Sequence, residues 1–168
     1  MTTLAAPSVT KLFLEFSRTK LIEEYWPRLR GCVEPLPPDR VWWRPNEASN
    51  SIGNLILHLN GNVQQWLVAS FNGLQDARDR PTEFSERQLI PASALLEKLG
   101  ATMADASSVL GRLTETDLLA TMHIQGHTVR RSRRGVPGGG AFRNALRADS
   151  FHHQAGAWRE FGILPPTG

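Results

Sequence analysis

Apolar side chains recur at three- and four-residue steps in three long segments of the chain, as in helices that bury one face. The pattern predicts helices over residues 9–34, 51–71 and 92–113. Pro27 lies inside the first segment and is expected to kink that helix or shift its end. Gly73 directly follows the second segment and is expected to end it. The sequence therefore predicts an all-α fold, a bundle built on three long helices.

The segments between these helices have other patterns. Trp42 and Trp43 lie in a loop over residues 41–50, where paired aromatic residues are expected to close one end of the core. Elsewhere the residues predict a proline-rich break at 34–39, a polar loop at 74–90, a capped turn at 114–119, and extended chain at 122–129 with a turn at Gly126.

The regular pattern ends near residue 129. Residues 130–147 contain six arginines and no acidic residue, and four glycines fall within residues 130–140. The rest of the chain is at most weakly helical in pattern, so no fourth bundle helix is predicted. We therefore divide the chain into a helical domain, residues 1–129, and an Arg/Gly-rich segment, residues 130–168, which we expect to be an unstructured tail.

Length and composition fit a cytoplasmic protein with one domain. The chain has 168 residues, of which 40% are hydrophobic. It contains no run of about 18 apolar residues, so we expect no membrane span. No signal peptide is recognised at the start, and Cys32 is the only cysteine, as is typical of a reducing compartment.

Three stretches carry a family resemblance. The longest is Trp42-Trp-Arg-Pro-Asn-Glu followed by Ser49-Asn-Ser-Ile-Gly-Asn-Leu-Ile-Leu-His-Leu-Asn-Gly-Asn-Val-Gln-Gln-Trp66, and shorter ones are Arg78–Phe84 and Ile124–Gly126. Together they resemble the DinB-like (YfiT-like) family over residues 9–129. The resemblance implies a four-helix bundle in which three histidines bind a divalent metal such as Zn²⁺ or Ni²⁺. It also implies kinship with metal-dependent hydrolases and transferases, some of which use a small thiol.

His58 matches the family's metal-binding histidine midway along the second helix. The family's other two histidines lie four residues apart on the last helix, where they share a face and reach one ion. No such run is present in this chain. His152 and His153 are candidate substitutes, but adjacent residues on a helix point in different directions. His123 and His127 have the right spacing, but they fall in the segment that is expected to be extended.

The genetic code suggests why the last helix is missing. Val136-Pro-Gly-Gly-Gly-Ala-Phe142 requires codons GTN CCN GGN GGN GGN GCN TTY, which one base later permit Tyr-Gln-Val-Val-Glu-His followed by Phe. In the same shifted frame, residues 143–152 permit Gly-Thr-His-Tyr-Gly-Gln-Ile-Leu-Phe-Ile. Both family histidines reappear, in order and at the expected place. We therefore hypothesise a one-base frameshift near codon 130, either a lesion in the gene or a sequencing error.

Three functional hypotheses follow. The first is a DinB-like metal-binding protein whose site is incomplete, with weak or absent metal binding and no catalysis. The second is a nucleic-acid-binding protein that uses the basic segment 130–147 to neutralise phosphates, although no aromatic residues interleave with these arginines. The third is a non-functional frameshifted copy. Without a fourth helix we also expect exposed apolar faces, and hence a homodimer, aggregation or degradation.

Overall fold

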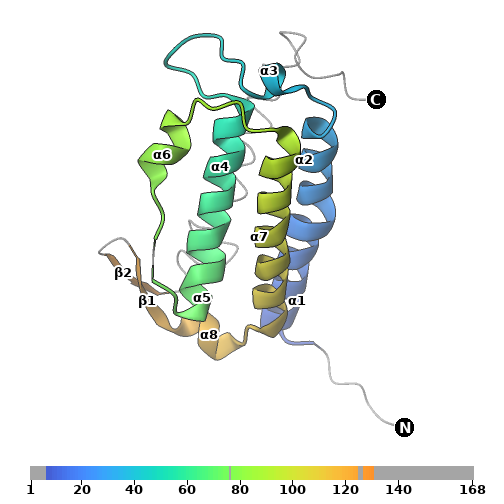
Figure 1. Cartoon of the computed structure of the whole chain (residues 1–168). Helices are drawn as coiled ribbons and strands as arrows, with labels where there is room; N and C mark the ends of the chain where they lie inside the picture. The colour runs from blue at the N-terminus through green and yellow to red at the C-terminus, as the bar shows by residue number, and fades with distance from the viewer. Residues whose placement is uncertain (1–6, 76, 125–126, 131–168) are drawn as a thin grey trace.

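The computed structural model describes residues 7–75, 77–124 and 127–130. Three long helical rods lie side by side (Figure 1), which confirms the predicted all-α bundle. The first rod comprises α1 (Val9–Arg18), η1 (Thr19–Tyr25) and α2 (Trp26–Val33). The second comprises α4 (Ile52–Val63), η2 (Gln64–Ala69) and α5 (Ser70–Asn72), and the third is the single helix α7 (Ala92–Arg112). The second and third rods run in the same direction, opposite to the first, because the chain between them returns along the bundle.

The ends of the rods have the expected local causes. Ser51 caps α4 through a reciprocal pair of hydrogen bonds with Asn54, and Gly73 ends the second rod with a left-handed backbone, φ 66°. Pro27 lies in the first turn of α2, directly after the π-helical segment η1. Proline lacks an N–H and crowds the preceding turn, so the wider π turn lets the first rod continue past it.

Two short helices occur where the sequence pattern predicted only loops. These are α3 (Pro38–Val41), within the predicted break and loop, and α6 (Arg80–Ser85), within the polar segment 74–90. The Asp79 side chain caps α6 by accepting the Thr82 N–H at 3.2 Å, and Pro81 suits its first turn. The loop prediction was wrong here because the start of α6 is marked by its cap and proline rather than by an apolar period.

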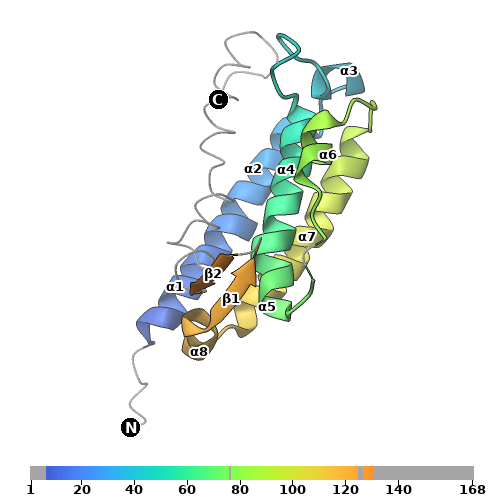
Figure 2. The ribbon, with the colours of Figure 1, turned by 90° about the vertical axis from the view of Figure 1, so that its left-hand side faces the viewer.

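The predictions near the end of the described chain are confirmed. The helix α8 (Glu115–Leu119) is capped by Thr114, and an antiparallel hairpin follows, formed by β1 (Thr121–Ile124) and β2 (His127–Arg130). Figure 2 shows this hairpin at the same end of the bundle as α8 and α5. The predicted turn residue Gly126 and the segment 131–168, including the place expected for a fourth helix, lie outside the described residues.

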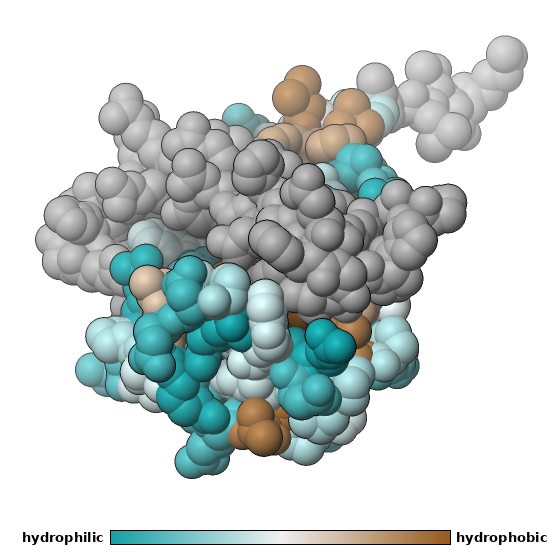
Figure 3. Space-filling model, turned by 90° about the horizontal axis from the view of Figure 1, so that it is seen from above, coloured by the Kyte–Doolittle hydropathy of each residue, from teal (hydrophilic) through white to brown (hydrophobic). Residues whose placement is uncertain are grey.

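The core lies between the three rods and is closed at one end by Trp42. Trp42 is 5% exposed, and its Nε1 donates to the carbonyl of Ile90 at 2.8 Å. A Cβ at Gly53 would come within 2.7 Å of that ring, so a glycine is needed at this point of α4. Trp43 is 36% exposed and does not share this role. Viewed from this end, the described surface is mostly hydrophilic (Figure 3).

The outer face of α1 carries an apolar stripe. Val9, Leu12 and Phe16 follow each other at steps of three and four residues and are each more than half exposed. In the described part of the chain, no helix is both long and apolar enough to cross a membrane.

Candidate functional site

His58 lies on α4 in a row of polar side chains that the short helix α6 covers. Asn62 and Gln65 continue this row by one and two turns and are only 6% and 3% exposed. The His58 side chain is 26% exposed, so it is the most accessible of these three. From the periodicity of α4 alone, this row is the edge of the apolar stripe and is expected to be solvated. The structure buries it, because α6 packs against α4.

Arg78 connects the row to α6. Its Nε donates to Oε1 of Glu83 at 2.6 Å and its Nη2 donates to Oε2 at 2.8 Å, which forms a bidentate ion pair. Its Nη1 donates to Oδ1 of Asn62 at 2.7 Å and to Oε1 of Gln65 at 3.0 Å. Its Nη2 also lies 3.4 Å from the carbonyl oxygen of His58. Each of the five N–H groups of the guanidinium thus has an acceptor among these described residues.

Both ring nitrogens of His58 belong to the same network. Nδ1 lies 2.8 Å from Oε2 of Glu83 and 3.0 Å from Nη2 of Arg78. Nε2 lies 3.0 Å from the amide nitrogen of Asn62. Phe84, which follows Glu83 on α6, contacts the imidazole with its ring centroid 4.7 Å away. The His58 ring is therefore held on both edges and on one face.

Glu83 is an ionised carboxylate that is almost fully buried. Its side chain is 10% exposed, and that of Arg78 is 7% exposed. Burial raises the pKa of the Glu83 carboxyl, but hydrogen bonds from Arg78 and His58 together with the charge of Arg78 outweigh this effect, and the pKa lies below its ordinary value. The Glu83 carboxylate is thus an ionised acceptor for both neighbours.

Gly61 lets this ion pair approach the backbone of α4. A Cβ at Gly61 would overlap with Oε1 of Glu83 and would lie 2.7 Å from Nε of Arg78. Any larger side chain would therefore displace Glu83, Arg78 or both. Gly61 belongs to the site in this steric sense, and periodicity alone gave no reason to select it.

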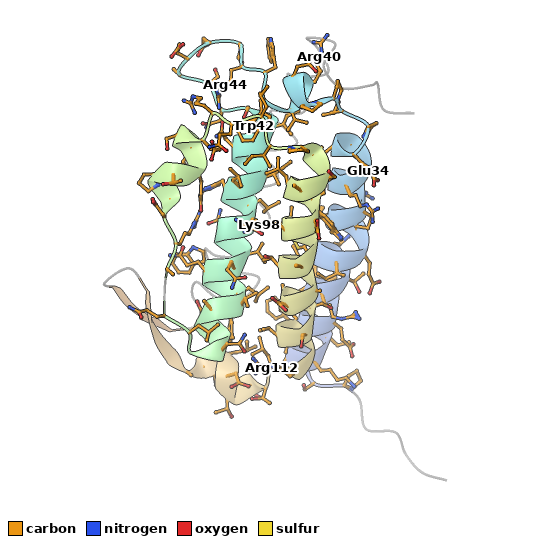
Figure 4. The ribbon with its side chains drawn as sticks, viewed as in Figure 1. Glu34, Arg40, Trp42, Arg44, Lys98 and Arg112 are labelled. Carbon is orange, nitrogen blue, oxygen red and sulfur yellow. The ribbon has the colours of Figure 1, made fainter. Side chains whose placement is uncertain are left out.

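A second set of contacts anchors α6 to the start of α4. Nδ2 of Asn54 donates to the carbonyl oxygens of Glu83 and Glu86 at 2.9 and 3.2 Å. Nη2 of Arg44 donates to Oδ1 of Asn54 at 2.6 Å and to the Glu86 carbonyl at 3.0 Å. Figure 4 shows Arg44 at the closed end of the bundle, near Trp42. The stretch from Trp42 to His58 thus supplies the support for α6 as well as the histidine.

A surface groove of about 400 Å³ runs beside the network between α4, α6 and α7. Gly61, Gln65, Arg78, Glu83 and Lys98 are among its lining residues, whereas His58 and Asn62 are not. Lys98 lies on α7 facing the side of the bundle seen in Figure 4. The groove therefore gives access to the Arg78–Glu83 ion pair rather than to His58.

His123 and His127, the two histidines with the spacing of the family's last-helix pair, do not lie on a helix. His123 and His127 belong to the two strands of the hairpin, where Ile124 pairs with His127. His152 and His153, with the arginines after Arg130, lie outside the described residues. Among the residues that are described, no group of three His, Cys, Asp or Glu side chains is arranged to hold a metal ion. Trp66 is a buried core residue, 8% exposed.

Sequence reasoning missed Arg78 and Glu83 as site residues. Both fall in the matched stretch Arg78–Phe84, but the polar pattern of residues 74–90 predicts only a loop there. The local signal was the cap and proline that start α6, which place Glu83 one turn into a helix. A short capped helix amid a polar segment needs a packing partner, and the polar row of α4 is that partner.

The sequence profile described as the DinB superfamily matches residues 21–138. The chain belongs to the DinB superfamily. The matched region contains His58, its supports on α4 and the whole of α6, so the network is built within the family's own scaffold. Comparisons with curated proteins and with solved structures give no match.

Proposed function

We propose that this DinB-superfamily protein supplies one ligand of a divalent-metal site, His58, and that the site is incomplete in this chain. Metal binding is then weak, and the chain is not an active enzyme. The observation that carries the proposal is the 2.8 Å contact between Nδ1 of His58 and the Glu83 carboxylate. Metal-binding histidines almost always donate their other ring N–H to a carboxylate or carbonyl, which orients the ring and raises its basicity.

The donor set supports one ligand but not a full site. Catalytic zinc sites use three protein ligands and leave a position open. Among the described residues no group of three candidate ligands is arranged around an ion, and His152 and His153 are the substitutes that the rest of the chain contains. A complete site would supply a cation that lowers the pKa of a small thiol and stabilises its thiolate at neutral pH. This is the chemistry of the thiol-dependent transferases to which the resemblance points.

Calorimetric titration of the metal-free full-length protein with Ni²⁺ or Zn²⁺ tests the proposal. We expect weak binding of one ion, and its loss in His58→Ala. His123→Ala, which removes a histidine of the hairpin, is the matched control and should leave the binding unchanged. Binding that survives His58→Ala would refute the role of His58. Tight stoichiometric binding by the unaltered protein would refute the incomplete site.

A further inference from the structure

We propose that Arg78 and Glu83 are positioning residues that fix His58 in one neutral tautomer, with the proton on Nδ1 and the lone pair on Nε2. The inference rests on the proposed function in that Nε2 is then the nitrogen that can bind a metal. It assigns roles to two residues of α6 and its preceding loop that lie 20 and 25 positions beyond the histidine in the chain. The contacts on the two edges of the imidazole carry it independently.

The first step concerns the Asn62 amide. Nη1 of Arg78 lies 2.7 Å from Oδ1 of Asn62. A guanidinium can only donate hydrogen bonds, so the oxygen of the amide must face it. The amide nitrogen then faces His58, where it lies 3.0 Å from Nε2. Because an amide nitrogen can only donate, Nε2 must accept and carries no proton.

The second step concerns the opposite edge of the ring. Oε2 of Glu83 lies 2.8 Å from Nδ1 of His58 and is an acceptor, since the carboxylate also receives two hydrogen bonds from Arg78. Nδ1 therefore donates and carries the proton. Nη2 of Arg78 is also 3.0 Å from Nδ1, but its two protons have acceptors in Glu83 and in the His58 carbonyl oxygen. The two edges thus require the same tautomer.

The third step concerns rigidity. Arg78 orients the hydrogen-bonding groups on both edges of the His58 imidazole. Its Nη1 holds the Asn62 amide, and its Nε and Nη2 hold the Glu83 carboxylate. Gly61 provides the space in which this pair lies against α4. Phe84 covers one face of the imidazole, so the ring cannot turn over without disturbing α6. The lone pair on Nε2 is consequently directed at the Asn62 amide, which a metal ion at Nε2 would have to displace.

The test is the tautomer of His58 in the metal-free full-length protein. Long-range proton–nitrogen NMR of ¹⁵N-histidine-labelled protein, at a pH where the imidazole is neutral, distinguishes protonated from unprotonated ring nitrogens. His58→Gln identifies the relevant signals by their disappearance. We expect a single Nδ1–H tautomer in the unaltered protein. Glu83→Gln should give a mixture of tautomers, because the anionic acceptor and its ion pair with Arg78 are lost.

Two further variants complete the experiment. Asn62→Asp replaces the donor at Nε2 by an acceptor and should place a proton on Nε2, while Nδ1 continues to donate to Glu83. Glu34→Gln is the matched control, since it alters an Arg–Glu pair, Arg30–Glu34, that is more than half exposed and far along the chain from the histidine. It should leave the His58 signals unchanged.

An Nε2–H tautomer in the unaltered protein would overturn the inference. So would folded Glu83→Gln and Asn62→Asp variants that both keep the original signals, because a purely structural role would leave the ring protonation unmoved. If the Nδ1–H tautomer is present and is lost in the variants, the positioning role holds. If the calorimetric titration then shows that Ni²⁺ binding does not depend on His58, only the proposed metal site is refuted.

Discussion

Removing the Glu83 carboxylate tests how the site is held together. Glu83→Ala deletes the acceptor of two Arg78 donors and of the His58 ring. Arg78 keeps its charge in a position where its side chain is only 7% exposed. Breaking a buried ion pair by removing one partner costs about 3–5 kcal/mol, chiefly because it leaves an uncompensated charge. Since the groove gives Arg78 some access to water, we expect about 3 kcal/mol.

The matched comparison is Glu34→Ala. Glu34 pairs with Arg30 at 3.0 Å on the surface of α2, and the two side chains are 56% and 58% exposed. Solvent screens an exposed pair of this kind, so that it contributes little to stability. The same chemical change should therefore destabilise the protein much more at Glu83 than at Glu34.

Urea unfolding followed by circular dichroism measures both variants, with the midpoints compared at equal slope. The double variant Glu83→Ala/Arg78→Met removes the stranded charge and should recover part of the stability lost in Glu83→Ala. Equal destabilisation by Glu83→Ala and Glu34→Ala would refute the buried ion pair. A double variant less stable than Glu83→Ala would refute the argument from an uncompensated charge.

Four further predictions follow from the same contacts. Gly61→Ala should destabilise the protein despite alanine's higher helix propensity, whereas Gly31→Ala, whose Cβ would meet nothing within 4 Å, should stabilise it by about 0.5–1 kcal/mol in the same urea assay; stabilisation at both positions would contradict the close approach at Gly61. Hydrogen bonds from Thr82 lower the pKa of Asp79, so the Asp79 cap stabilises the folded protein above the pKa that Asp79 has in the unfolded chain, and this stability is lost as the pH falls through the folded-state pKa. The urea midpoint of the unaltered protein should therefore exceed that of Asp79→Asn by less as the pH is lowered, and a constant difference would argue against the cap. Phe16→Asp should shift a homodimer towards monomer in sedimentation velocity if the exposed stripe of α1 is its interface, and an unchanged dimer would exclude this face. Moving the reading frame forward by one base near codon 130 should yield a protein that binds nickel stoichiometrically through His58, and no gain in binding would count against the frameshift hypothesis.

The long helices were predictable because each repeats its signal many times. The apolar stripe of α7 recurs over 21 residues, so local errors average out, and Gly73 marks the end of the second rod through its own backbone preference. The helix α6 has six residues, fewer than two turns, and cannot show a period. Its cap, Asp79, and the proline that follows were the only local signals, and such signals also occur in turns.

The environment of His58 was not predictable from α4 alone. A residue at the polar edge of an apolar stripe is solvated unless another element covers it, and here the cover comes from Glu83, 25 residues later in the chain. The family resemblance selected His58 but attached no role to its neighbours. Their roles follow from donor and acceptor chemistry, which becomes decisive only once Arg78 is known to contact Asn62.

The described supports of His58 all precede residue 90, and this bears on what the chain retains. Arg44 and Asn54 anchor α6, Gly61 admits the ion pair, and Arg78 with Glu83 orients the ring. Each of these contacts joins residues between 44 and 86, before the segment in which the hypothetical frameshift would act. A loss of the last helix would therefore remove two ligands while leaving the first ligand and its positioning residues in place. If the tautomer of His58 is fixed but metal binding is weak, then binding is weak because two ligands are missing and not because His58 is poorly oriented.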